Sequence, residues 1–207
     1  MRIVSINTGV VAPLFVAAQG SMSSVKSAFD KTSVSRLDHP QPVQVHLTGL
    51  EGDEQADRQV HGGEDKAIYA YPHEHYPFWQ ELIERETHST PHFEAGAFAE
   101  NLTIEGFLES EVWVGDLWLV GGVGGVELSV VKLREPCFKF TARMNYKGAA
   151  KAMIQSAKSG WYLRVRQPGV IQAGDTIRVV PGPRKVTIEQ QNRLLLQKQS
   201  SSQDLFD

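Results

Sequence analysis

Short apolar segments at close spacing, separated by turns that contain glycine or proline, constrain the fold of this chain most strongly. Val43, Val45 and Leu47 alternate with polar residues, which is the period of a strand with one buried face. Residues 161–166 alternate in the same way. The same reasoning predicts further strands at residues 3–6, 67–71, 126–133 and 176–180.

Two helices are predicted between these strands. Residues 73–86 place Pro77 in a first helical turn, where its missing N–H costs little, and carry apolar side chains on one face. Residues 147–158 form the second helix, with Gly160 as its C-terminal cap, whereas the polar residues 19–32 predict a loop. This mixture predicts a β-rich α+β fold, a β-barrel or closed sheet with a few inserted helices, rather than a doubly wound α/β sheet.

Composition narrows the class of protein. At 207 residues, 41% of them hydrophobic, the chain has enough apolar material for one large domain. Its net charge of -3 argues against stable nucleic-acid binding, which normally needs a basic face. One cysteine cannot form an internal disulfide, which fits a reducing compartment. The first residues resemble no secretory signal, and no apolar run is long enough to span a membrane, so we expect a cytoplasmic protein.

The single cysteine, Cys137, lies in a basic stretch of the sequence. The surrounding cations are Lys132, Arg134, Lys139 and Arg143. Positive charge favours a thiolate, the form of cysteine that attacks electrophiles and binds soft metals. Pro136 removes a backbone donor and biases Glu135 away from helix, so Cys137 is predicted in a fixed turn after the strand at 126–133. The alternative is a buried, inert cysteine.

A second candidate region is rich in charge and glycine. Gly62 and Gly63 follow His61, and without a Cβ their backbone can approach a ligand closely and form an anion-binding nest. Lys66 adds a point charge at the entrance of the next predicted strand. Asn101, beside an apolar pair, offers both a hydrogen-bond donor and an acceptor. The alternative for the glycine pair is a solvated turn.

His73 and His75 invite a metal-site interpretation. Their spacing of two residues points the side chains apart on a helix, and no further pattern of cysteines or carboxylates supports zinc. We therefore expect no metal site at these two histidines.

Four blocks, in a fixed order, carry a resemblance to a known family. They are Val60-His61-Gly62-Gly63-Glu64-Asp65-Lys66, Tyr71-Pro72-His73-Glu74-His75-Tyr76, Glu100-Asn101-Leu102-Thr103, and Arg134-Glu135-Pro136-Cys137-Phe138-Lys139 with Gly160-Trp161-Tyr162-Leu163-Arg164. Together they resemble the MOSC family, named for the C-terminal domain of molybdenum-cofactor sulfurases, and within it the YiiM-like branch. On this resemblance, residues 1–180 form the MOSC domain and residues 181–207 a short, partly flexible C-terminal tail.

The resemblance implies a β-barrel-like fold and a bound molybdenum cofactor, a pterin (molybdopterin) that carries the metal and ends in a phosphate. It implies that Cys137 either ligates molybdenum or carries sulfur, and that the blocks with His61, Gly62, Gly63, Lys66, Asn101 and Arg134 line the cofactor pocket. It further implies reduction of N-hydroxylated compounds, including base analogues. Thiolate suits molybdenum, and Arg, Lys and backbone amides suit a phosphate.

This sequence departs from the family pattern in two places. The glycine usual before Glu-Asn-Leu is Ala99 here, which is expected to crowd a backbone approach. YiiM-like proteins often end in a three-helix extension, whereas this chain stops soon after residue 196, so a surface for a redox partner on that extension is not expected.

Three functions stay open from the sequence. The first is a molybdenum-dependent reductase of N-hydroxylated small molecules, the second a cofactor or persulfide carrier without turnover of its own, and the third a binding domain with a degenerate pocket. No motif for flavin, haem or an iron–sulfur cluster is present, so a reductase would take electrons from a separate reductase protein. A homodimer is also left open.

Overall fold

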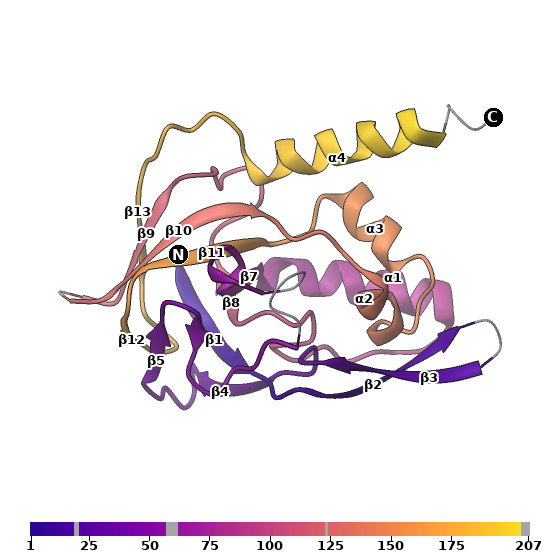
Figure 1. The fold of residues 1–207 in the computed structure, drawn as a ribbon, viewed down its shortest axis with the longest axis horizontal. Helices are drawn as coiled ribbons and strands as arrows, with labels where there is room; N and C mark the ends of the chain where they lie inside the picture. The colour runs from indigo at the N-terminus through magenta and orange to yellow at the C-terminus, as the bar shows by residue number, and fades with distance from the viewer. Residues whose placement is uncertain (19–20, 57–61, 123, 204–207) are drawn as a thin grey trace.

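A computed structural model describes residues 1–18, 21–56, 62–122 and 124–203 (Figure 1). The strands are β1 (Arg2–Thr8), β2 (Ala12–Ala18), β3 (Ser21–Ser27), β4 (Thr32–Arg36), β5 (Val43–His46), β6 (Gly49–Leu50), β7 (Ile68–Pro72), β8 (Leu102–Glu105), β9 (Leu117–Val120), β10 (Val126–Leu133), β11 (Trp161–Gln167), β12 (Gly169–Ile171) and β13 (Ile177–Val180). The helices are η1 (Glu64–Lys66), η2 (His73–His75), α1 (Tyr76–Thr87), α2 (Phe138–Arg143), α3 (Ala149–Ser156) and α4 (Ile188–Gln203).

One eight-stranded sheet dominates the fold, in the order β13-β9-β10-β11-β7-β8-β1-β4. Its neighbours are antiparallel except β7 and β8, which are parallel and are connected through α1. The sheet curls until the segment that precedes β13, at one end, meets β1, which lies one strand in from the other end: Arg2 forms a bridge with Thr176, and the Ile3 N–H donates to the Asp175 carbonyl at 3.0 Å. The predicted β-rich, barrel-like fold with a few inserted helices is confirmed.

Two apolar cores lie on opposite faces of this sheet. The inner core fills the curl and contains Trp118 and Trp161, whose rings meet edge to face at 5.7 Å. The outer core lies under α1, α2 and α3, where Trp79, Phe98 and Phe140 pack together. None of the described helices is long and apolar enough to cross a membrane.

Several local predictions are confirmed. Helix α1 carries Pro77 in its first turn, and the side chains on its buried face are Tyr76, Trp79, Leu82 and Ile83. Strand β10 ends at Leu133, and Cys137 lies outside helix, as the residue that precedes the first turn of α2.

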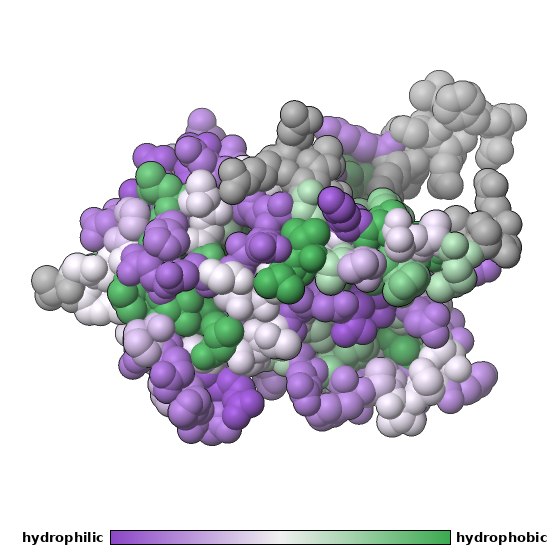
Figure 2. All heavy atoms as spheres, turned by 60° about the horizontal axis from the view of Figure 1, so that its bottom comes forward, coloured by the Kyte–Doolittle hydropathy of each residue, from purple (hydrophilic) through white to green (hydrophobic). Residues whose placement is uncertain are grey.

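The polar segment 19–32 is not a loop, because its described part forms β3 and the start of β4. The sequence Ser21–Ser27 lacks a clear apolar alternation, and it is a strand because its backbone pairs with β2. The resulting ribbon carries exposed apolar side chains, Phe15 and Met22. On the face that Figure 2 brings forward, apolar and polar side chains are interspersed.

Two further details differ from the prediction. Ala157, with φ of 55°, caps α3, whereas Gly160 belongs to the turn that enters β11. The segment after residue 181, predicted as a short tail, contains the helix α4, which lies against the body of the molecule with Ile188 and Asn192 fully buried.

Candidate functional site

Cys137 lies at the junction between the main sheet and α2. Its carbonyl oxygen accepts hydrogen bonds from the N–H groups of Phe140, at 3.0 Å, and Thr141, at 3.3 Å, which fixes the backbone of the turn. The thiol is free, and the residue is half-buried. The position therefore combines a hydrogen-bonded backbone with a free thiol on a half-buried residue.

Arg134, three residues earlier, is 5% exposed. Its guanidinium carbon lies 4.9 Å from the ring centroid of Phe140, 5.4 Å from that of Tyr69 and 5.8 Å from that of Phe29. One guanidinium nitrogen lies 3.3 Å from the sulfur of Met153. Aromatic faces and a thioether thus surround this cation.

No carboxylate among the described residues forms an ion pair with Arg134. Burial opposes its charge, but the nearby Tyr69, Tyr162 and Cys137 side chains raise the pKa of Arg134 overall, so the guanidinium stays charged. A buried charge is costly unless it is paired, and apart from the Tyr162 hydroxyl, to which the guanidinium can donate, its neighbours are aromatic rings and a thioether, which accept hydrogen bonds only weakly. This position therefore favours an anionic ligand.

Arg134 lines a small cavity of about 110 Å³. Lys66 and Asn101, both predicted as site residues, line the same cavity. The Lys66 ammonium lies 5.9 Å from the centroid of the Tyr162 ring. Pockets for drug-sized ligands usually measure several hundred Å³, so this volume matches one charged end of a ligand.

Asn101 is bound internally. Its side-chain oxygen accepts from the Tyr69 N–H at 3.0 Å, and its side-chain nitrogen donates to Asp53 at 2.8 Å. Asp53 also accepts from Lys31 and from the Gly9 N–H. Asn101 therefore holds the wall of the cavity together and has little capacity left for a ligand.

The glycine pair approaches the cavity only indirectly. Gly63 has φ of 88°, in the left-handed region that favours glycine, and its N–H donates to the Gln55 side chain, which lines the cavity. Gly62 and Gly63 are not among the lining residues. His61 lies outside the described residues.

Ala99 also lines the cavity. Its φ is 66°, a conformation that costs an L-residue with a Cβ roughly 1–2 kcal/mol. This explains physically why glycine suits the position. The Ala99 methyl group both strains the backbone and occupies space in the cavity wall.

Lys139, one of the cations near Cys137 in the sequence, lines the cavity too, together with four side chains that the sequence analysis did not select: Phe29, Lys31, Tyr69 and Tyr162. The alternation of β11 offered one signal, because it separates Tyr162 from the buried Trp161 and Leu163. Burial raises the pKa of Tyr162 while the Arg134 charge opposes that rise, which places the phenol beside the guanidinium. Phe29 could not be found this way, because it lies within the segment predicted as a loop.

A larger groove, of about 1010 Å³, adjoins the small cavity through Lys31, which lines both. Loop residues such as Phe93 and His92 form one wall, and Arg143 at the end of α2 lies on another. Two cations of this groove have carboxylate partners: Arg36 pairs with Asp38, which also lines the groove, and Arg143 pairs with Asp30.

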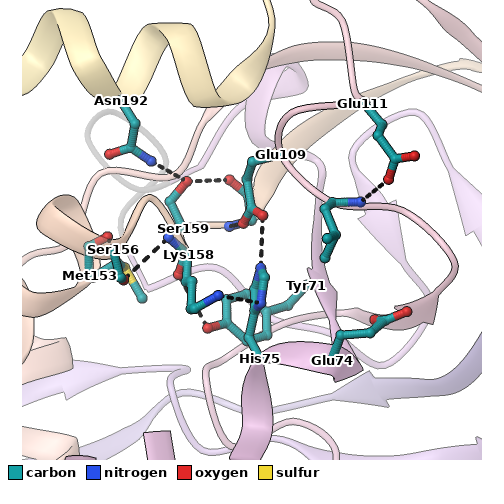
Figure 3. Close-up of polar contacts among 12 residues, drawn as sticks. Tyr71, Glu74, His75, Glu109, Glu111, Met153, Ser156, Lys158, Ser159 and Asn192 are labelled. Atoms are coloured by element: carbon teal, nitrogen blue, oxygen red, sulfur yellow. Dashed lines mark hydrogen bonds and ion pairs between the residues drawn. The ribbon is translucent and has the colours of Figure 1, made fainter. Parts of the chain in front are cut away.

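His75, one of the two histidines of the second block, has a structural partner. His75 is buried, and its Nε2 lies 2.7 Å from Glu109 Oε2 (Figure 3). The other carboxylate oxygen, Glu109 Oε1, accepts the Gly160 N–H at 2.8 Å. In the described part of the chain, no three His, Cys, Asp or Glu side chains gather closely enough to hold a metal ion. Any metal at Cys137 would therefore take its other ligands from a cofactor or from solvent.

The sequence and the fold are similar to those of known proteins. The profile of the MOSC domain matches residues 57–178. Protein YiiM of Escherichia coli (strain K12) is 36% identical over 142 residues, 69% of this chain and 61% of that protein. A reductase of Gibberella moniliformis is 34% identical over 153 residues, 73% of this chain and 26% of the reductase. The crystal structure of YiiM from Geobacillus stearothermophilus has a TM-score of 0.69 at 33% identity, covering 94% of this chain and 83% of that one. The chain thus spans less than two thirds of the length of each of these two relatives, the Escherichia coli protein and the Gibberella moniliformis reductase.

Proposed function

The chain belongs to the MOSC domain family, and on that premise we propose that it binds the molybdenum cofactor and reduces N-hydroxylated small molecules. The observation that carries the proposal is the buried Arg134, charged and without a carboxylate partner among the described residues, three positions before the only cysteine. The name of the Gibberella moniliformis relative, a reductase, supports a reaction of this class.

The residues present fit such a cofactor. Arg134 and Lys66 provide positive charge on the wall of a cavity sized for an anionic group, which suits a phosphate. Cys137 provides a soft sulfur donor from a fixed backbone, which suits molybdenum. When bound, the cofactor would supply the redox chemistry, while the protein supplies ligation, orientation and electrostatics.

Each side chain has a distinct task in this proposal. Arg134 neutralises the anionic end of the cofactor, and the rings of Phe29, Tyr69 and Phe140 keep the guanidinium in place and exclude water from it. Cys137 holds the metal through its thiolate. In this proposal a separate reductase protein supplies the electrons.

The proposal is tested on protein purified without oxygen from cells that make the cofactor. We expect molybdenum and a phosphorylated pterin at nearly one per chain. Cys137→Ser should abolish reduction of hydroxylamine-type substrates by a supplied electron donor while much of the pterin stays bound, because a serine hydroxyl is a poor replacement for a thiolate.

Two results would overturn the proposal. Neither metal nor pterin in a preparation where a known molybdoenzyme is loaded would exclude cofactor binding. Full reductase activity in Cys137→Ser would remove the role assigned to that thiol. Absence of turnover together with an added mass of about 32 Da (one sulfur) on Cys137 after exposure to a cysteine desulfurase would instead identify a persulfide carrier.

A further inference from the structure

We infer that helix α4 positions the Arg134–Cys137 segment, and that Gln191 and Asn192 are the positioning residues; the link to catalysis rests on the function proposed above. The helix lies along one side of the molecule, against β10 and α3 (Figure 1). It contributes no residue to the lining of the cavity. Helix α4 can therefore affect the site only through its contacts with neighbouring segments, such as the end of β10.

The first connection runs from Gln191 to the end of β10. The side-chain oxygen of Gln191 accepts the Leu133 N–H at 2.8 Å. Leu133 is the last residue of β10 and directly precedes Arg134, whose own N–H donates to the Gly160 carbonyl at 3.2 Å. A side chain of α4 thus satisfies the backbone at the point where the chain leaves the sheet toward Cys137.

The second connection runs from Asn192 to the aromatic wall around Arg134. Asn192 is fully buried, and its side-chain nitrogen donates to Ser159 Oγ at 3.0 Å (Figure 3). The Ser159 carbonyl accepts the Tyr69 hydroxyl at 2.8 Å. The Tyr69 ring in turn lies 5.4 Å from the Arg134 guanidinium, so this connection ends at the same cation.

Both connections meet at the turn that contains Ser159 and Gly160. Gly160 has φ of 61°, and a Cβ there would lie 2.4 Å from the Ala70 carbonyl oxygen, so the position requires glycine and the turn packs closely against β7. Glu109 Oε1 accepts the Gly160 N–H at 2.8 Å. A substitution in α4 therefore acts on two groups next to the site, the Leu133 N–H that precedes Arg134 and the Ser159 hydroxyl beside the Tyr69 contact.

The hydrogen bonding of the Asn192 amide also indicates a positioning role. Its Oδ1 is buried and has no hydrogen-bond partner among the described residues. An unsatisfied buried acceptor is costly, so an apolar residue would suit simple packing better. The amide is explained by the donor that it supplies to Ser159.

The test uses the full chain and its single cysteine as a reporter. Gln191→Met keeps the size of the side chain but removes the acceptor, Gln191→Glu keeps an acceptor oxygen, and Arg193→Ala changes an exposed residue of the same helix. The rate of Cys137 alkylation by iodoacetamide is measured in cofactor-free protein, and cofactor content is measured separately in protein from cofactor-producing cells.

We expect Gln191→Met to change the alkylation rate at least threefold, because the backbone that leads from β10 to Cys137 would lose a hydrogen bond that fixes it, and to lower the cofactor content. Gln191→Glu and Arg193→Ala should match the original chain. If Gln191→Met does not fold, Asn192→Leu tests the second connection with the same two measurements.

An unchanged alkylation rate in folded Gln191→Met, with only a lower melting temperature, would overturn the inference and leave α4 a packing element. Equal loss in Gln191→Met and Gln191→Glu would also overturn it, because the acceptor would then be irrelevant. If the original chain holds no cofactor, the proposed function fails, yet the alkylation rates still decide the role of α4.

Discussion

Two buried polar regions of this molecule have opposite characters. In the His75–Glu109 network, formed by His75, Glu109, Lys158 and the Gly160 N–H, both oxygens of the carboxylate have partners. In the arginine cavity, lined by Arg134, Lys66, Tyr69 and Tyr162 among others, the buried guanidinium contacts rings and a sulfur but no carboxylate of the described chain.

The contrast separates a structural role from a binding role. A polar cluster that satisfies itself stabilises the fold and offers nothing to a ligand. A cation that is kept buried with weak acceptors costs stability, and that cost is offset only when an anion binds. Substitutions in the first region should therefore change folding, and substitutions in the second should change binding.

The largest effect is expected for Glu109→Ala, which leaves the His75 ring and the Gly160 N–H buried without their acceptor. The free energy of unfolding, measured by urea denaturation, should fall by about 3 kcal/mol or more. The matched control, Glu111→Ala, removes an exposed carboxylate from the same loop and should cost roughly 0.5 kcal/mol. A similar, small cost for both variants would contradict the structural role of the network.

Arg134→Met should show the reverse pattern. Its free energy of unfolding should change by no more than about 1 kcal/mol, or rise, because a desolvated charge is replaced by an apolar side chain. Cofactor retention should weaken roughly tenfold or more, since a charge-assisted hydrogen bond contributes about 1.5–3 kcal/mol. Arg166→Met, at an exposed position of β11, should leave retention unchanged. Unchanged retention in Arg134→Met would show that the cavity is not the phosphate site.

Ala99→Gly tests stability and binding at a single residue, because Ala99 has a strained backbone and also lines the arginine cavity. Relief of the left-handed backbone should raise the free energy of unfolding by roughly 1 kcal/mol, and the lost methyl group should enlarge the cavity. Ala97→Gly, two residues earlier and without a positive φ, should instead lower stability by roughly 0.5–1 kcal/mol. Thermal denaturation of both variants measures these changes. A loss of stability in both variants would show that the backbone at Ala99 is not strained.

The smallest effect is expected for Lys66→Ala. This side chain is half-buried at the cavity wall, so its contribution to cofactor retention should be about 1 kcal/mol or less and should decrease with added salt. Retention measured at low and high ionic strength checks this. A loss larger than that of Arg134→Met would mean that the order of importance of the two cations is reversed.

The parts of the fold that were predictable from sequence are the local ones. Strand β10, the turn at Pro136 and the amphipathic helix α1 each follow from residues within a few positions of one another. The grouping of Lys66, Asn101 and Arg134 around one cavity came only from the family resemblance, since these residues lie on different strands and loops.

The rest depends on pairings between distant residues. Strand β3 has a polar sequence and exists because β2 supplies its hydrogen bonds, and Phe29, just beyond it, then reaches Arg134. The partner of His75 lies on a loop 34 residues away. Neither contact leaves a periodic pattern in the sequence, so pattern analysis could not have identified them.

The position of β1 has a consequence for how the chain is made. This first strand lies between β4 and β8, and its Arg2 also bridges to Thr176. During synthesis on the ribosome, its apolar side chains therefore stay unpacked until their partners have been made. The last of these partners is the segment around Thr176, which closes the curl of the sheet against β1. Topologies dominated by such distant pairings fold in milliseconds to seconds and expose unpaired edges meanwhile. We therefore expect newly made chains to be most prone to aggregation before β8 has emerged, and the finished barrel to form as one of the last events of folding.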